Sequence, residues 1–150
     1  MLQILIDADA CPVKDETYKV AARYQVPVVV VSNSPIRVPR EPLISRQLVS
    51  AAFDAADDWI ADHTGPGTIV ITADILLADR CLKLGAAVIA PNGNPFTSAS
   101  IGSAIAVRAI MADLRAGGDI VGGPPPLRKT DRSRFLSSLD QAVVKLQRQA

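Results

Sequence analysis

The chain has 150 residues, of which 49% are hydrophobic, 21% are charged and only 4% are aromatic. These numbers predict one aliphatic globular domain over residues 1–150 and exclude disordered and fibrous classes. The net charge of +1 conceals an asymmetry, because residues 1–75 carry 6 basic and 10 acidic side chains, whereas residues 76–150 carry 10 basic and 5 acidic ones. We expect an acidic site flanked by a basic surface for a polyanion; a solvated basic tail is the alternative.

Membrane insertion and zinc binding are not expected. No stretch reaches the roughly 18 uncharged apolar residues of a transmembrane helix, and no signal-peptide pattern opens the chain. We therefore expect a cytoplasmic protein with no membrane partner. Two cysteines and a single histidine supply neither a disulfide framework nor a zinc ligand set. Any metal ion would be held by oxygen ligands.

Strand and helix patterns alternate along the chain. Buried strands are predicted at 2–6, 26–34, 44–51, 67–74 and 86–93. Helices are predicted at 12–24, 54–63, 75–85, 100–118 and 131–148. This alternation predicts an α/β fold with three α/β/α layers and a mostly parallel central sheet.

The connections and the last two helices carry further expectations. Three prolines predict a loop at 35–42, and the Gly/Pro-rich segment 117–126 reads as a linker. The helix at 100–118 is nearly all apolar, so we expect it to pack against the sheet. Asp131 is expected to cap the final helix, which would pack back on the domain or on a second subunit, making a homodimer an open option.

Acidic residues follow the predicted strands. Asp7 and Asp9 end the first strand, and Asp74 ends a later one. Ligands bind outside the carboxyl ends of parallel strands, so these acids should meet at one edge of the sheet. Asp54 and Asp57 lie three residues apart on one helical face and would join them if the preceding strand is parallel. Aspartates without histidine or cysteine favour Mg²⁺ or Mn²⁺.

A structural interpretation of the same residues stays open. Asp9 would then cap the first helix, while Asp54 and Asp57 would only complement a helix dipole. With a metal ion bound, the chemistry that fits is phosphodiester hydrolysis, which needs no protein nucleophile.

Polar and basic residues near the expected site are candidates for binding substrate. Arg37 lies in the loop after the second strand, and Arg128 and Arg132 lie around the start of the last helix, where they could hold phosphates. Asn33, at the end of the second strand, could contact a phosphate or bond a turn. The few aromatic residues do not support sequence-specific reading of single strands.

Several motifs resemble the YaiI/YqxD family of uncharacterised bacterial proteins over essentially the whole chain. They are "DADACPV" (7–13), "FDAADDWI" (53–60), "ITADILLA" (71–78), the "NG" turn near 92, "GGPPP" (122–126) and "DRSRF" (131–135). The resemblance implies a PIN-like nuclease fold whose Asp-x-Asp, Asp-x-x-Asp and Thr-x-Asp motifs form an acidic metal site. The matching residues here are Asp7, Asp9, Asp54, Asp57 and Asp74. We therefore expect a metal-dependent nuclease acting on RNA rather than DNA.

Two other functions remain alternatives. "DADACPV", "VVVVSNS" and "ITADILLAD" also resemble motifs of haloacid dehalogenase phosphatases, in which Asp7 would be the nucleophile and Asp9 the general acid. That fold expects a lysine between the second and the acidic motif, and residues 33–73 contain none. The second alternative is a degenerate nuclease fold that binds RNA or a protein partner without catalysis.

Overall fold

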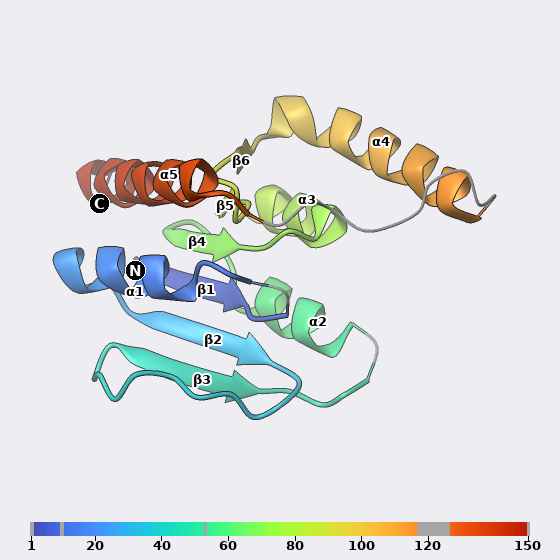
Figure 1. The fold of residues 1–150 in the computed structure, drawn as a ribbon. Helices are drawn as coiled ribbons and strands as arrows, with labels where there is room; N and C mark the ends of the chain where they lie inside the picture. Colours follow the sequence, from blue (N-terminus) through green and yellow to red (C-terminus); the bar gives the residue numbers. More distant parts are fainter. Residues whose placement is uncertain (1, 10, 53, 117–126, 150) are drawn as a thin grey trace.

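Alternating strands and helices form a six-stranded sheet covered by helices in the computed structural model of the protein (Figure 1). The structure describes residues 2–9, 11–52, 54–116 and 127–149. Its strands are β1 (Gln3–Asp7), β2 (Val28–Ser32), β3 (Ile44–Leu48), β4 (Thr68–Ile71), β5 (Ala87–Ile89) and β6 (Pro95–Phe96). Its helices are α1 (Lys14–Tyr24), α2 (Ala55–Asp62), α3 (Ile75–Lys83), α4 (Ser98–Ala116) and α5 (Lys129–Gln149).

The sheet is mostly parallel, as the sequence predicts. The strand order is β3-β2-β1-β4-β5-β6, and only the short β6 runs antiparallel to its neighbour. In the centre, Ile6 of β1 lies beside Val30 of β2 and Ile71 of β4. Because these neighbours are parallel and in register, the residues that follow them emerge at one edge of the sheet.

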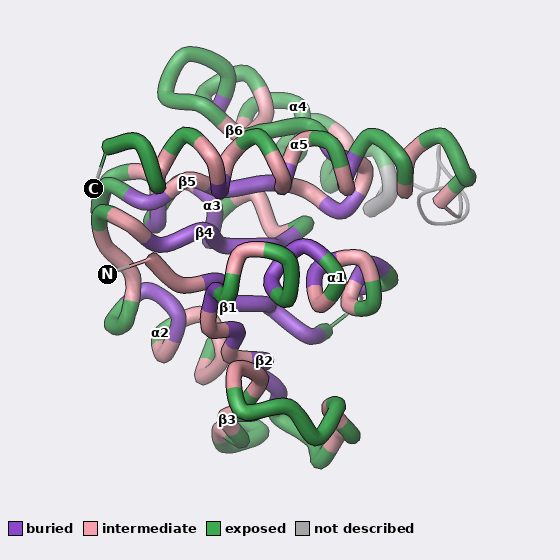
Figure 2. The backbone as a smooth tube through the Cα atoms, turned by 90° about the vertical axis from the view of Figure 1, so that its left-hand side faces the viewer, coloured by how far each residue is buried: buried purple, intermediate pink, exposed green. Residues whose placement is uncertain are grey.

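Each face of the sheet has its own apolar core, because successive strand residues point to opposite faces. Ile4 and Ile6 of β1 pack with α1 and with Phe135 and Leu139 of α5 on one face. Leu5 of β1 packs with α2 and α3 on the other. Figure 2 shows the buried strands between these helices. The three-layer α/β/α arrangement is confirmed.

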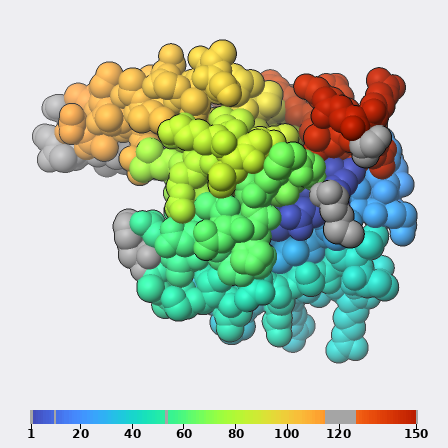
Figure 3. All heavy atoms as spheres, turned by 180° about the vertical axis from the view of Figure 1, so that it is seen from behind, coloured from blue at the N-terminus to red at the C-terminus, as the bar shows by residue number. Residues whose placement is uncertain are grey.

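Helix α4 does not pack against the sheet, so that expectation is wrong. Ile101 and Ile105 pack in the core beside α3, but Val107 and Ile110 are 58% and 59% exposed. The sheet face on that side is already covered by α2 and α3, so α4 forms an additional outer layer on α3. Figure 3 shows its far half extending past the body of the protein.

The start of α5 differs from the expectation that Asp131 caps this helix. Asp131 is not the N-cap of α5, because the helix begins at Lys129. Its carboxylate instead accepts a hydrogen bond from the Arg128 N–H at 3.0 Å, which satisfies a free donor at the helix start from inside the first turn.

The linker predicted at 117–126 lies outside the described residues. Among the residues that are described, no helix has the length and apolarity of a membrane span.

The core contribution of α5 can be measured with two matched leucines. Leu139 is fully buried and Leu84, at the end of α3, is 46% exposed. We expect Leu139→Ala to lower the free energy of unfolding by about 2–5 kcal/mol, because it leaves a cavity against the sheet. Leu84→Ala should change it by less than about 0.5 kcal/mol. Urea denaturation measures both; equal losses would contradict the packing of α5 described above.

Candidate active site at the carboxyl edge of the sheet

A cleft of about 480 Å³ opens at the edge where the parallel strands end. It brings together all five predicted acids with Asn33: Asp7, Asp9, Asp54, Asp57 and Asp74. Its other lining residues are alanines: Ala51, Ala52, Ala55, Ala56 and Ala73. Among the described residues that line it, none is lysine or arginine. The cleft is therefore strongly negative, and the side chains that line it between the acids are short.

Asp7 is held by the strand next to it. It is the last residue of β1 and is only 8% exposed. Thr72, directly after β4, donates its hydroxyl to Asp7 Oδ2 at 2.9 Å. The Asp74 N–H in turn donates to Thr72 Oγ1 at 3.0 Å. The parallel pairing of β1 with β4 thus fixes the orientation of the Asp7 carboxylate through one buried threonine.

Asp74 has a structural task and still borders the cleft. It is the N-cap of α3, where its Oδ1 accepts from the N–H groups of Leu76 at 2.9 Å and Leu77 at 3.2 Å. Within the described chain its Oδ2 has no hydrogen-bond partner. One oxygen therefore stabilises the helix, and the other is left for a ligand.

Asp9 does not cap the first helix, so that structural interpretation is wrong. The N-cap of α1 is Val13, and no side chain bonds there. Asp54 does precede α2, at its N-cap position, but its carboxylate makes no capping hydrogen bond. Its φ is 64°, in the left-handed region that a residue with a side chain seldom adopts. Aspartate adopts this region more readily than most residues with a side chain, and Gln25 at the end of α1 shares it, so the backbone conformation alone assigns Asp54 no role.

The electrostatics of the cleft disfavour full ionisation. Burial raises the pKa of Asp7, and the nearby charges of Asp9 and Asp74 raise it further against the lowering effect of the Thr72 hydrogen bond. Burial, followed by the charges of Asp74, Asp7 and Asp54, raises the pKa of Asp57 to about 6. Carboxylates repel one another here because no cation in the lining offsets them.

The donor set fits a hard divalent cation, with a limit set by geometry. All the charged groups are carboxylates, the oxygen ligands that Mg²⁺ and Mn²⁺ prefer. Over the described ranges, no three acidic, histidine or cysteine side chains are close enough together to hold one ion between them. Mg²⁺ commonly keeps several waters and takes only one or two carboxylates. The cleft fits an ion of that kind, with Asp7 and Asp74 as the strand-end ligands.

The four predicted substrate residues separate into two groups. Asn33 lines the cleft. The three arginines do not. Arg132 is engaged at the start of α1, where its Nη1 donates to the Pro12 carbonyl at 2.7 Å and to Glu16 at 3.1 Å. Arg37 and Arg128 are exposed on the surface away from the cleft lining.

The motif Thr-x-Asp predicted only its aspartate as a site residue, so the sequence did not identify Thr72. The signal was present: a hydroxyl residue directly follows a buried strand, where a polar side chain needs a partner. Thr72 is 1% exposed, and its partner is Asp7. The alanine lining carried no such signal, since alanine is common everywhere in helices and loops.

Comparison with known proteins gives a consistent identification. Residues 5–145 match the model of the uncharacterised YaiI/YqxD family. The chain is 66% identical over 146 residues to the UPF0178 protein of Sphingopyxis alaskensis, covering 97% of this chain and 95% of that protein. It is 57% identical over 148 residues to a UPF0178 protein of Bradyrhizobium sp. (strain ORS 278), covering 99% and 90%. No solved structure matches the chain.

The raised pKa of Asp57 makes a prediction about pH. The folded protein holds this proton more tightly than the unfolded chain, where the pKa is 3.8, so the free energy of unfolding falls as pH rises from about 4 through about 6. Asp57→Asn should therefore stabilise the metal-free protein by about 1 kcal/mol near neutral pH, after allowing for solvent screening of a partly exposed group. The gain should shrink on acidification.

Urea denaturation with a chelator present, near neutral pH and near pH 4, measures this effect. Asp62→Asn is the matched control, because Asp62 lies on the same helix outside the cleft lining. It should give no gain in stability. A gain from Asp57→Asn that does not depend on pH would contradict the assigned repulsion.

Proposed function

The chain belongs to the YaiI/YqxD family, and because that family is uncharacterised we propose a function from the acidic cleft. We propose that the protein is a metal-dependent phosphodiesterase that cleaves RNA with Mg²⁺ or Mn²⁺. The observation that carries this proposal is the cleft itself, where five aspartates gather without a basic residue in the lining. Uncompensated carboxylates of this kind are stabilised by a divalent cation.

The residues of the cleft would share the work. Asp7 and Asp74 would hold the ion from two adjacent strand ends, and Asp9, Asp54 and Asp57 would complete its shell through water. When bound, the ion activates a water, orients the phosphate and neutralises charge on the leaving oxygen. Thr72 keeps Asp7 in one orientation through its hydrogen bond, so the carboxylate need not reorganise on binding.

The short side chains that line the cleft suit a polymeric substrate. Five alanines surround the acids, so the cleft floor is open to a phosphate on a chain that continues on both sides. RNA is the substrate that the resemblance to PIN-like nucleases favours. The PIN-like assignment, a cytoplasmic location and a homodimer stay predictions.

The phosphatase alternative is less well supported. It needs a cation beside Asp7 to steady the phosphate, and no lysine or arginine lines the described cleft. The RNA-binding alternative keeps the same surface and differs only in turnover.

Metal binding can be tested by thermal unfolding. Saturating Mn²⁺ should raise the melting temperature of the wild type, since an ion present at about 100 times its Kd adds about 2.7 kcal/mol to folded-state stability. Asp7→Asn should lose most of that rise. The control is Asp62→Asn, which removes an acid from α2 outside the cleft. An identical melting temperature with and without millimolar Mn²⁺ would refute the metal site.

Activity is tested with labelled RNAs, both single-stranded and structured, incubated with Mg²⁺ or Mn²⁺. The wild type should shorten them, and Asp7→Asn should slow cleavage by about 100-fold or more, as expected when an electrostatic contribution to the transition state is lost. Asp62→Asn should cleave normally. Retardation of RNA without shortening would support the binding module instead. Trapping of the protein by beryllium fluoride would support an aspartyl-phosphate and the phosphatase.

A further inference from the structure

We infer that Arg108 on α4 binds a phosphate of the RNA strand that crosses the acidic cleft, and that the free half of α4 forms one rim of the substrate path. The inference rests on the proposed function and adds a substrate-binding residue to it. It starts from the position of α4, which continues beyond the helix that supports it.

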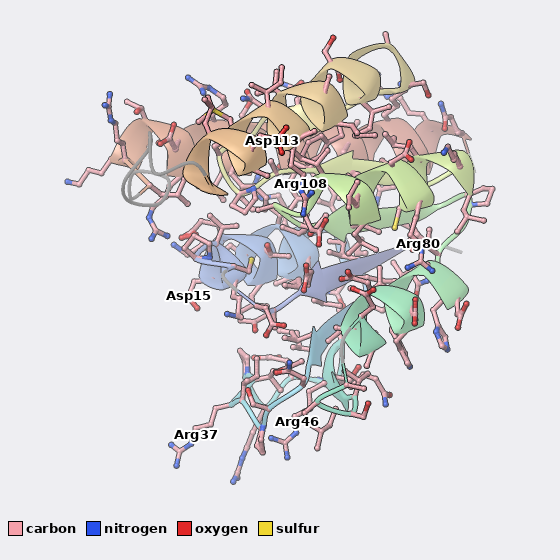
Figure 4. The ribbon with its side chains drawn as sticks, turned by 90° about the vertical axis from the view of Figure 1, so that its right-hand side faces the viewer. Asp15, Arg37, Arg46, Arg80, Arg108 and Asp113 are labelled. Carbon is pink, nitrogen blue, oxygen red and sulfur yellow. The ribbon has the colours of Figure 1, made fainter. Side chains whose placement is uncertain are left out.

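The helical period places Arg108 on the inner face of α4. Ile101, Ile105 and Arg108 follow one another at i, i+4 and i+7, so they share one face. Ile101 is buried, and Ile105 packs against the core beside α3. Arg108 continues this stripe one turn further. Figure 4, which faces the strand ends, shows Arg108 on the side of α4 turned toward the body of the protein.

The free half of α4 lies at the same end of the molecule as the cleft. Strands β1, β2 and β4 point toward that end, and α4 runs in the same direction past α3 (Figure 1). Asp74, which lines the cleft, is the N-cap of α3, so α4 overlies the element that begins at the cleft. Arg108 is thus placed near the α3 side of the acidic floor.

Charge pairing separates Arg108 from other arginines of the protein. Arg80 and Arg132 are paired with Asp58 and Glu16, respectively. In the part of the chain that the structure describes, Arg108 has neither an ion-pair partner nor a side-chain hydrogen bond. An exposed guanidinium without a carboxylate keeps its donors available, and its planar fork matches two phosphate oxygens.

Other basic residues at this end of the molecule lie outside the cleft lining. Arg37 and Arg46 lie on the β3 side in Figure 4, whereas Arg108 lies on the α4 side. The strand order from β3 to β5 covers four inter-strand spacings, about 20 Å. A bare phosphate is too small to bridge that width, but a polynucleotide strand is not. Acids in the cleft and Arg108 on the α4 side suit a chain that binds metal at one phosphate and an arginine at a neighbouring one.

The test is binding of a labelled, cleavage-resistant phosphorothioate RNA of about 12 nucleotides in Mn²⁺, a length within the usual range of single-strand sites. Arg108→Gln should weaken Kd by about tenfold and reduce the slope of log K against log salt by about 0.7, the loss of one phosphate contact. Arg108→Lys should retain the salt slope and recover part of the affinity.

Arg148→Gln is the matched control. Arg148 is exposed in the last turn of α5, which ends at the opposite edge of the sheet (Figure 1), so its loss changes net charge equally and should leave RNA binding unchanged. A dinucleoside monophosphate has a single phosphate and cannot place one on the metal and another at α4, so Arg108→Gln should bind it as the wild type does. The rise of melting temperature with Mn²⁺ should also be unchanged in Arg108→Gln.

Two results would overturn the inference. Wild-type affinity in Arg108→Gln for the longer RNA would remove Arg108 from the substrate path while leaving the metal site and cleavage in place. An equal loss in Arg148→Gln would show a general charge effect. A wild-type protein that neither binds nor cleaves RNA in Mn²⁺ would instead overturn the proposed function, and this inference with it.

Discussion

Repulsion among carboxylates at one edge of the sheet is the constraint on which the rest of this structure depends. Parallel pairing of β1 with β4 brings the residues after Ile6 and after Ile71 to the same edge, so Asp7 and Asp74 meet there whatever their charge. Burial and mutual repulsion raise the pKa of Asp7 and Asp57, which means that their ionisation opposes folding near neutral pH. The two apolar cores on either face of the sheet must offset this cost. A cluster of acids whose ionisation opposes folding is typical of function maintained at the expense of stability.

The site is shaped by backbone positions rather than by ion pairs. A single buried hydroxyl, that of Thr72, orients Asp7, and Asp74 divides its two oxygens between a helix terminus and the cleft. Asp54 occupies a left-handed backbone position that glycine would adopt with less strain. None of these three features, the Thr72 hydrogen bond, the Asp74 cap and the Asp54 backbone position, places a cation beside the acids. The carboxylates therefore stay available to an external ion, which an internal salt bridge would have displaced.

Basic residues are arranged around this acidic floor in two ways. Some are used to join elements: Arg132 ties α5 to α1 through Glu16, and Arg23 ties α1 to Asp140 of α5. Others, including Arg37 and Arg108, are exposed and form no ion pair within the described residues. Arg132 and Arg108 show that both arrangements occur in the basic second half of the chain. The internal ion pairs of Arg132 and Arg23 join α1 and α5 in the helical layer over the sheet.

The sequence by itself determined the layer architecture and the identity of the acids. Unbroken β-branched runs such as Val28–Ser32, alternating with helical periods, admit only a parallel sheet between helices, and the carboxyl-edge rule then brings distant aspartates together. Only the tertiary structure decided which helices reach the sheet and which charges are free. The apolar periodicity of α4 predicts that one face of the helix is buried, but it does not say which part of the protein that face packs against. Helices α2 and α3 already cover that side of the sheet. In the same way, the basic character of Arg132 is local, whereas its pairing with Glu16 depends on α5 crossing α1, a contact between residues 116 positions apart.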